Sequence, residues 1–349
     1  MAIHVIIYHR IINFKFKFKK VIFMNILVTG GRGFIGKRLV EALMQKGFQF
    51  DVLSRSEVDD PTSRDRSTVL IKGDLIDPQF DFEVLASKYD VIFNCSGELH
   101  DEALMQSLHV DAIKHFVRAC KVMAKSQNKS IHWVQLSSVG AYGPSRPVAN
   151  VERVVTEETL TNPIGMYEVT KTLADELIIQ ASKDGWFTYS ILRPSNVFGK
   201  DMPNSSIRQL GRMIRSNLFF YIGKPGAVSN YVHVDDVAEA LALCGFDSRA
   251  KNQVFNLSND CPQEHVFGAM AIALASSEPK IRINERLIRF FVFLFSWLKW
   301  FPLKKSRVEA LVNRTHYPND KIHKLLGFVP SRDVTKTISE VLLNNKVER

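Results

Sequence analysis

The fold is decided by residues 25–36, which read Asn-Ile-Leu-Val-Thr-Gly-Gly-Arg-Gly-Phe-Ile-Gly. A buried-strand pattern leads into closely spaced glycines, and a helical pattern follows. In this context glycines allow a tight turn and a close backbone approach to a pyrophosphate, which the N–H groups of the helix N-terminus can bind. The stretch therefore predicts a dinucleotide-binding turn. Its candidate cofactor contacts are Gly30, Arg32, Gly33, Phe34, Ile35 and Gly36.

Short β-branched runs alternate with longer helical patterns through the first half of the chain. The strand candidates are residues 25–29, 50–54, 69–71, 91–94, 132–137 and 189–192, and the helical stretches include 35–45, 104–124 and 166–182. This order is typical of an α/β fold, with a Rossmann-type doubly wound parallel sheet covered by helices. We expect residues 24–193 to form that dinucleotide-binding domain.

The alternation weakens after Pro194, where Gly, Pro and Asn cluster at residues 198–206 and 223–230. We therefore expect residues 194–349 to form a smaller C-terminal substrate-binding lobe, with some elements that return to the core. Internal repeats and low-complexity segments are absent from the sequence.

Residues 1–23 differ from the rest, because aromatic and basic residues alternate over residues 14–20 just ahead of Met24. We expect Met24 to be the natural start and the extension to be an artefact of the start site or a loosely held arm. The alternative is a membrane-associating leader. Its apolar part, residues 5–12, is short for a signal peptide and is interrupted by His9 and Arg10.

The bulk composition fits a globular protein, since the 349 residues are 46% hydrophobic. A net charge of +10 suggests attraction to a nucleotide cofactor, a phosphorylated substrate or an acidic membrane surface. The positive charge is dispersed, which argues against nucleic-acid binding. The four cysteines form no Cys-x-x-Cys pair, so we expect no metal site and no disulfide framework, in a reduced, cytoplasmic protein.

Specificity for one dinucleotide is expected at the end of the second strand, where NAD-binding proteins carry an acidic residue for the ribose hydroxyls. This chain has Ser54-Arg55-Ser56 there. Arg55, with Arg32, suits the 2′-phosphate of NADP, which favours NADP over NAD. The alternative is that both arginines are solvated surface residues. Asp74, with Leu75 beside it, is placed to reach the adenine, and a capping role for Asp74 is the alternative.

A second signal is Tyr167-Glu168-Val169-Thr170-Lys171 near the start of a helical pattern. On a helix, residues four apart share a face, so the ammonium of Lys171 can lower the pKa of the Tyr167 phenol and bind the nicotinamide ribose. Tyr167 then becomes a usable acid/base. The string gains weight because a Ser-Ser pair, Ser137 and Ser138, ends a strand candidate between it and the glycine turn.

With these motifs the chain resembles the extended short-chain dehydrogenase/reductases, the NAD(P)-dependent epimerase/dehydratase family, from Met24 through about Pro330. The resemblance also covers Leu-Arg-Pro-Ser-Asn-Val-Phe-Gly at residues 192–199, Tyr-Val-His-Val-Asp-Asp-Val-Ala at 231–238 and Leu-Gly-Phe-Val-Pro at 326–330. It implies that Ser138 is the catalytic hydroxyl, Tyr167 the acid/base and Lys171 its partner. It also implies that Asn196 lies near the substrate and that the protein is a homodimer.

Three positions depart from the family pattern. His109 stands where members often carry Asn, which leaves a proton relay and a satisfied core histidine as alternatives. Ser54 replaces the acidic residue of NAD-using sugar epimerases. Ser229-Asn230-Tyr231 replaces an Arg-Asp-Tyr whose arginine holds a nucleotide-sugar diphosphate. The sequence offers substitutes for that arginine at Arg208, Arg212 and Arg314.

An apolar, aromatic segment spans residues 287–303 and is bracketed by basic residues. It contains Arg289 and Lys299 and is too short to cross a bilayer comfortably. It suits either peripheral contact with the membrane, with its tryptophans at headgroup depth, or a helix packed on the lobe or in a dimer interface. A similar segment occurs in the hydroxysteroid-dehydrogenase branch of the superfamily, by the same resemblance.

The leading functional hypothesis is an epimerase or dehydrogenase that acts on a secondary alcohol of a sugar, nucleotide-linked, through hydride transfer with Tyr167 as acid/base and Ser138 on the substrate oxygen. The alternative is a hydroxysteroid-dehydrogenase-like enzyme, or one acting on a lipid-linked sugar, peripheral at the inner face of the membrane. A third hypothesis is a non-catalytic dinucleotide-binding scaffold.

Overall fold

The computed structural model describes residues 24–56, 68–144, 151–295, 297 and 303–343. The expectations for residues 1–23, as an artefact, an arm or a leader, lie outside the described residues.

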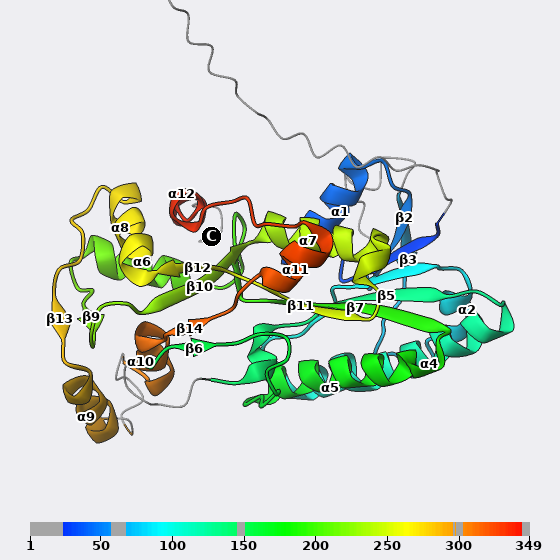
Figure 1. The fold of residues 1–349 in the computed structure, drawn as a ribbon, viewed down its shortest axis with the longest axis horizontal. Coiled ribbons are helices and arrows are strands. Elements are labelled where there is room, and N and C mark those ends of the chain that lie inside the picture. The colour runs from blue at the N-terminus through cyan, green and yellow to red at the C-terminus, as the bar shows by residue number, and fades with distance from the viewer. Residues whose placement is uncertain (1–23, 57–67, 145–150, 296, 298–302, 344–349) are drawn as a thin grey trace, which may run out of the picture.

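A parallel sheet of seven strands forms the larger part of the molecule (Figure 1). Its order is β11-β7-β5-β4-β1-β2-β3, and every neighbouring pair is parallel. The strands are β1 (Ile26–Thr29), β2 (Phe50–Ser54), β3 (Thr68–Lys72), β4 (Val91–Asn94), β5 (Ile131–Leu136), β7 (Phe187–Pro194) and β11 (Gln253–Leu257). All six predicted strands are present, and the predicted doubly wound α/β fold is confirmed. The seventh strand, β11, was not among the predicted strands.

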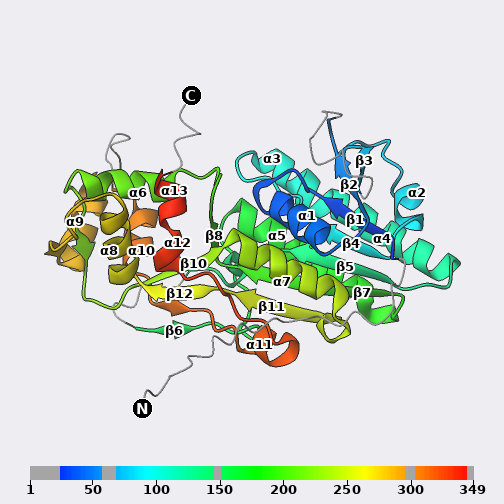
Figure 2. The same cartoon turned by 90° about the horizontal axis from the view of Figure 1, so that it is seen from above.

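Helices cover both faces of this sheet. One face carries α1 (Phe34–Gln45), α7 (Val234–Phe246) and α11 (Asp320–Leu326), and the other carries α2 (Phe82–Ser87), α4 (Ala112–Ser126) and α5 (Met166–Ala181) (Figures 1 and 2). Alternating strand residues feed the two cores: Val28 packs with the first set and Leu27 with the second, because successive side chains of a strand point to opposite faces. The predicted helix 104–124 is present as α3 (Glu102–Met105), the π-helix η2 (Gln106–Asp111) and α4.

The remaining elements form a lobe at one end of the sheet (Figure 2). A three-stranded sheet in the order β12-β10-β8 and two small strand pairs, β13-β9 and β14-β6, support its helices. The strands are β6 (Arg153–Val154), β8 (Asn196–Phe198), β9 (Tyr221–Ile222), β10 (Val228–His233), β12 (Asn259–Pro262), β13 (Arg282–Ile283) and β14 (Thr315–His316). The helices are α6 (Ser206–Arg215), α8 (Gln263–Ala273), α9 (Glu285–Phe295), α10 (Lys305–Val312), α12 (Val334–Thr337) and α13 (Ser339–Leu343).

The lobe has its own core, which Phe198, Phe219 and Phe267 join. The chain enters the lobe after β7, but α7, β11 and α11, all beyond residue 193, pack on the large sheet. A division of the chain at residue 193 stays a prediction. Over the part of the chain that the structure describes, no helix is both long and apolar enough to cross a bilayer.

Candidate active site

The glycine turn between β1 and α1 is built by close backbone packing. Gly30 has φ of +67°, and a Cβ there would lie 2.5 Å from the carbonyl carbon of Cys95. At Gly36 a Cβ would clash with the carbonyl oxygen of Gly30. The turn therefore requires glycine at both positions. Gly33 caps α1 without a side-chain hydrogen bond and no acidic residue lies in the first turn, so the helix N-terminus is suited to an anion.

A cleft of about 400 Å³ lies above this turn. The expected cofactor contacts that line it are Gly30, Arg32, Gly33, Arg55, Asp74 and Leu75, joined by residues 95–98 after β4. Phe34 and Ile35 begin α1, but their side chains pack against the lobe core and the sheet core. What these two residues offer a cofactor is therefore their backbone N–H groups.

Arg32 of the glycine turn and Arg55 at the end of β2 both line the cleft. Arg32 donates a hydrogen bond of 2.8 Å to the hydroxyl of Ser56, across the gap between the glycine turn and β2. Arg55 is exposed and lines the cleft. Of the described residues at the end of β2, which are Ser54, Arg55 and Ser56, none is acidic, whereas NAD-binding proteins carry a ribose-binding carboxylate at this place.

Asp74 and Leu75 form the cleft wall after β3. The carboxylate of Asp74 accepts a hydrogen bond of 3.2 Å from the backbone N–H of Ile76, so it does cap a turn. Asp74 also lines the cleft, and Leu75 is buried beneath it. The capping role and a place beside a cofactor are therefore compatible.

Tyr167 and Lys171 lie four residues apart on α5, and neither side chain lines the cleft. The Tyr167 ring packs edge-on against His109, whose Nε2 accepts a hydrogen bond from the backbone N–H of Glu98, a cleft residue. Lys171 is buried and close enough to Cys95, another cleft residue, to lower the pKa of its thiol against the larger effect of burial. Lys171 therefore lies beside a residue of the cleft wall, and Tyr167 is linked to another through His109.

Ser138 lies in the loop after β5, against the first turn of α5. Its hydroxyl accepts a hydrogen bond of 3.0 Å from the backbone N–H of Gly140. A Cβ at Gly140 would lie 2.7 Å from the Glu168 side chain, which shows how closely this loop approaches the residue after Tyr167. The same loop ends at Gly143, which lines a second, larger pocket. The three predicted catalytic residues line neither pocket, but Ser138 begins the loop that reaches the larger one and Lys171 lies beside Cys95 in the wall of the cleft.

The pKa of the Tyr167 phenol differs from the sequence-based expectation. Within the protein chain, burial raises it to about 12, and the carboxylates of Glu168 and Asp175 add to the rise. A lowered pKa was predicted from Lys171 alone, and the two nearby carboxylates were not considered. Burial also lowers the pKa of Lys171, against the charge of Asp175. Tyr167 therefore carries its proton at neutral pH.

A buried ion pair missed by the sequence analysis lies behind Lys171. Asp175 accepts hydrogen bonds from Arg193, at 3.0 and 3.1 Å, and from the hydroxyl of Ser137 at 2.7 Å. Its other carboxylate oxygen has no hydrogen-bond partner among the described residues. Asp175 follows Lys171 by one helical turn, and this spacing is the signal that would have found it.

His109 is a satisfied core histidine. Its ring is buried, and because Nε2 accepts from Glu98, Nδ1 carries the proton and donates to the Thr170 hydroxyl at 2.9 Å. Burial lowers the pKa of His109 to about 3, and the charge of Lys171 contributes. The neutral ring therefore ties the loop after β4 to α5, one residue from Lys171. Of the two alternatives for His109, the geometry favours the structural one.

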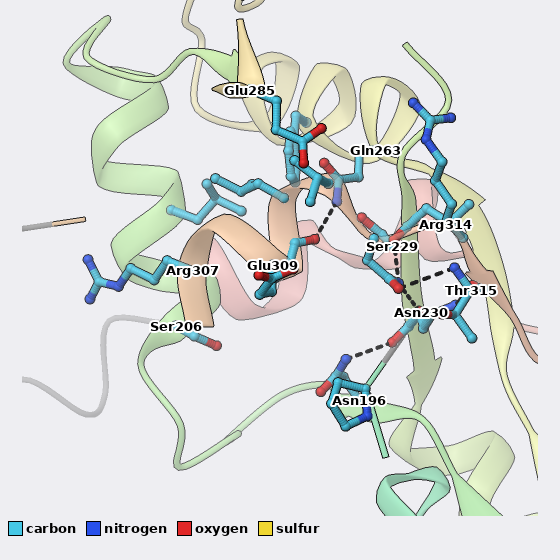
Figure 3. A pocket seen from close by; sticks show the side chains of 18 of the residues that line it. Asn196, Ser206, Ser229, Asn230, Gln263, Glu285, Arg307, Glu309, Arg314 and Thr315 are labelled. Atoms are coloured by element: carbon cyan, nitrogen blue, oxygen red, sulfur yellow. Dashed lines mark hydrogen bonds between the residues drawn. The ribbon is translucent and has the colours of Figure 1, made fainter. Parts of the chain in front are cut away.

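The second pocket lies inside the lobe and has a volume of about 800 Å³ (Figure 3). Asn196 lies at one end, where its amide donates to the backbone carbonyl of Asn230 at 3.0 Å, and Glu285 lies at the other (Figure 3). Most of the lining side chains are apolar or aromatic. They include Leu210, Met213, Phe219, Phe220, Val228, Tyr231, Phe267, Ile288, Phe291, Leu303, Leu311 and Val312.

Among the described residues, three arginines line this pocket, Arg289, Arg307 and Arg314, and Arg307 donates to the side-chain oxygen of Gln209 at 3.1 Å. Arg289 is held between Glu285, at 2.8 Å, and Glu309, at 2.7 Å. Arg314 donates to the backbone carbonyls of Lys224 and Pro225. Of the other expected substitutes for a diphosphate-binding arginine, Arg208 and Arg212 do not line the pocket, and Arg208 donates to the carbonyl of Met202.

No group of three or more His, Cys, Asp or Glu side chains suited to a metal ion occurs in the described ranges of the chain.

Comparison with known proteins identifies the family. The sequence model of the NAD dependent epimerase/dehydratase family matches residues 26–258, from β1 through β11. The chain belongs to that family. Its membership makes it an NAD-dependent enzyme of the oxidoreductase or epimerase kind, and the predicted family is confirmed.

Relatives of this family member act on different compounds. It is 27% identical over 245 residues to a 4-hydroxy-2-methyl-3-oxo-4-farnesyl-3,4-dihydroquinoline-1-oxide ketoreductase of Stigmatella aurantiaca, covering 69% of this chain and 70% of the relative. It is 23% identical to the decarboxylating sterol-4-alpha-carboxylate 3-dehydrogenase of Saccharomyces cerevisiae, covering 91% and 97%. The crystal structure of UDP-glucuronic acid 4-epimerase from Bacillus cereus in complex with NAD superposes with a TM-score of 0.68 at 17% identity, covering 93% and 100%.

Proposed function

We propose that this enzyme interconverts a secondary alcohol and a ketone, with Tyr167 as the proton donor and acceptor. When bound in the cleft above the glycine turn, the nicotinamide dinucleotide supplies or takes up a hydride. Tyr167, whose pKa is raised to about 12, holds its proton at neutral pH and can donate it to a carbonyl oxygen. Ser138 would hydrogen-bond that oxygen, and Lys171 would bind the ribose.

The substrate that the lobe pocket supports best is apolar and carries one polar reacting end. The observation that carries this proposal is the lining of the pocket: mostly apolar side chains, with Asn196 at one end (Figure 3) and with Gly143, from the loop that begins at Ser138, in its wall. A nucleotide diphosphate needs cations, and of the three arginines in the pocket Arg289 is held by two carboxylates, whereas Arg307 and Arg314 donate to uncharged oxygens. A pocket of about 800 Å³ lined in this way matches a sterol-sized or prenylated compound.

Two relatives support the same class, since the farnesylated dihydroquinoline ketoreductase and the sterol dehydrogenase have apolar substrates by name, whereas an ADP-L-glycero-D-manno-heptose-6-epimerase of Pseudomonas aeruginosa, 26% identical over 272 residues, supports a nucleotide sugar. The nucleotide-sugar epimerases that resemble the structure are below 25% identity and support the fold alone. The proposal therefore favours the lipid-directed alternative given in the sequence analysis over the leading hypothesis there, a nucleotide-sugar substrate.

The test is turnover on a panel of 3β-hydroxysterols, prenylated ketones, and UDP- and GDP-sugars, each with NAD and with NADP. We expect turnover on the apolar members, and Tyr167→Phe is expected to reduce it about 10²- to 10⁴-fold while dinucleotide binding is kept. Tyr189→Phe is the matched control, because this nearly buried tyrosine lies on β7.

Turnover of nucleotide sugars alone would show that the substrate class is wrong while the chemistry stands. Full activity in the Tyr167→Phe variant would show that the acid/base assignment is wrong.

A further inference from the structure

The outer side of α9 presents large apolar side chains to solvent, at the end of the lobe farthest from the large sheet (Figures 1 and 2). Phe290 is 58% exposed and Trp297 is 75% exposed, and Leu287, Phe291, Phe293 and Leu294 are each more than 40% exposed. The opposite side is fixed, because Ile288 and Val292 are buried against Ile222 and Val308. We call the exposed side chains of residues 287, 290, 291, 293, 294 and 297 the α9 face.

Basic side chains surround the α9 face. Arg286, Lys304 and Lys305 are exposed on either side of it. The nearby carboxylates, Glu285 and Glu309, are both bound to Arg289, so the three side chains together carry one negative charge against the three positive charges of Arg286, Lys304 and Lys305. The result is an apolar surface with a positive rim, in a chain whose net charge is +10.

The α9 face is continuous with the lobe pocket. Phe291 is 41% exposed and also lines the pocket, as do Ile288 on the same helix and Leu303 just before α10. Phe291 belongs to both surfaces and so places the α9 end of the pocket beside the face, while Asn196 lies at the other end of the pocket (Figure 3).

We propose that the α9 face docks on an anionic lipid surface and that the apolar part of the substrate passes from the bilayer into the lobe pocket. Exposed Phe and Leu side chains can enter the acyl region, a Trp ring suits the headgroup depth, and the surrounding cations attract anionic lipid. An 11-residue helix is about 16 Å long, so it lies in the interface instead of spanning the bilayer.

A second copy of the chain fits the face less well. In a symmetric dimer built on α9, the Arg286, Lys304 and Lys305 side chains of both copies would approach one another, and like charges oppose that contact. An anionic membrane offers the opposite charge at the same place. The lipid-docking half of the proposal stands on this surface alone, and the passage of substrate rests on the proposed function.

The experiment is cosedimentation of the full chain with phosphatidylcholine vesicles, with and without phosphatidylglycerol. We expect binding to the anionic vesicles that weakens at high salt. Phe290→Glu/Trp297→Glu is expected to weaken it by about tenfold or more per residue, because burying one such side chain contributes about 1.5–3 kcal/mol. Arg286→Glu/Lys304→Glu/Lys305→Glu, which leaves the apolar face intact, is expected to abolish the preference for anionic vesicles.

The matched control is Ile272→Glu, which adds a charge at a side chain that is 73% exposed on α8, outside the α9 face. It is expected to bind vesicles like the original chain. Dinucleotide binding and the melting temperature report that each variant is folded.

Lack of binding to anionic vesicles would overturn the docking proposal. A dimer in lipid-free solution that Phe290→Glu/Trp297→Glu converts to a monomer would overturn it in favour of a second copy. Vesicle binding without turnover of any apolar substrate, even in detergent, would leave the docking intact and overturn the proposed function.

Discussion

The dinucleotide cleft and the lobe pocket are built by opposite means. The cleft, of about 400 Å³, is lined by backbone, glycines and polar side chains at the carboxyl ends of parallel strands. The pocket, of about 800 Å³, is lined by apolar side chains from small strands and short helices. In the cleft, backbone atoms, which are the same for every residue type, would contact a cofactor of fixed shape. In the pocket, side chains, which differ with residue type, would contact the substrate.

The ion pairs of the large sheet and of the lobe also differ, in how far their side chains are buried. Asp175 and Arg193 are almost completely buried behind Lys171. In the lobe, Arg289 and Glu309 remain about one-third exposed. Each charge of a buried ion pair has lost its hydration and depends on the opposite charge to offset that loss. A charge in an exposed pair stays hydrated when its partner is removed.

The largest expected effect comes from breaking the buried pair. Asp175→Asn leaves the Arg193 charge unpaired in the core, which costs about 3–5 kcal/mol in the free energy of unfolding. Glu309→Gln in the lobe should cost about 1 kcal/mol or less. Urea unfolding of both variants measures the difference, and equal losses would remove the contrast between the halves.

Gly30 in the cleft and Gly223 in the lobe test the same contrast between the two regions at the level of the backbone. Gly30→Ala places a Cβ against the backbone of Cys95 and should reduce dinucleotide affinity at least about tenfold, with a lowered melting temperature. Gly223→Ala, in the lobe, has a similar φ of +71°, but its nearest neighbour is the movable Glu285 carboxylate at 3.1 Å. That variant should show only the backbone strain, about 1–2 kcal/mol, and normal dinucleotide binding. Isothermal titration with NAD and NADP tests both, and intact binding in Gly30→Ala would contradict the assignment of the cleft.

The sequence was most informative where local patterns determine structure. Strands such as β1 and β4 begin with continuous apolar runs, Ile-Leu-Val and Val-Ile-Phe, so their positions follow from the residues alone. The turn at Gly30 could be predicted because close contacts require its glycines. These contacts lie within the turn, between Gly36 and Gly30, and between Gly30 and Cys95 after the neighbouring strand β4. The strand β11 was missed because it is short and carries the polar Asn256, and because its pairing with β7 joins segments more than 60 residues apart.

The character of the lobe pocket could not be predicted in this way. Its walls come from segments between Gly143 and Tyr317, and no local pattern shows that these side chains converge. The pairing of Arg289 with Glu309 is likewise invisible in the sequence, where the arginine looks available to an anion. The π-helical turn that carries His109 was also missed, because an ordinary helical periodicity runs through it.

A smaller effect is expected on the affinity of the cleft for NADP relative to NAD, and it tests the polar side chain of Arg55. Arg55→Glu adds a carboxylate at the end of β2, where Arg55 is exposed and lines the cleft. If Arg55 binds the 2′-phosphate of NADP, the variant should lose about tenfold to a hundredfold in NADP affinity, since a hydrogen bond to a charged group contributes about 1.5–3 kcal/mol. Affinity for NAD should stay within about twofold, because NAD lacks that phosphate. Arg215→Glu, on α6 in the lobe, is the control, and equal losses for both dinucleotides would count against NADP preference.

The smallest expected effect is the dependence of stability on acid, and it again separates the halves. His109 has a folded-state pKa of about 3, below the value of about 6.5 for an unfolded histidine, so the unfolded chain binds the proton more tightly. Stability is therefore complete above about pH 6.5 and falls as the pH drops towards 3, by about 1.4 kcal/mol at pH 5.5 from this residue. His109→Asn should remove its own share of the fall in the free energy of unfolding between pH 7 and 5 and leave the share of His132, whose pKa burial lowers to about 4, whereas His265→Asn, at an exposed histidine of the lobe, should leave the fall unchanged. Parallel pH profiles for His109→Asn and the original chain would mean that the link from the loop after β4 to α5 does not depend on a neutral imidazole.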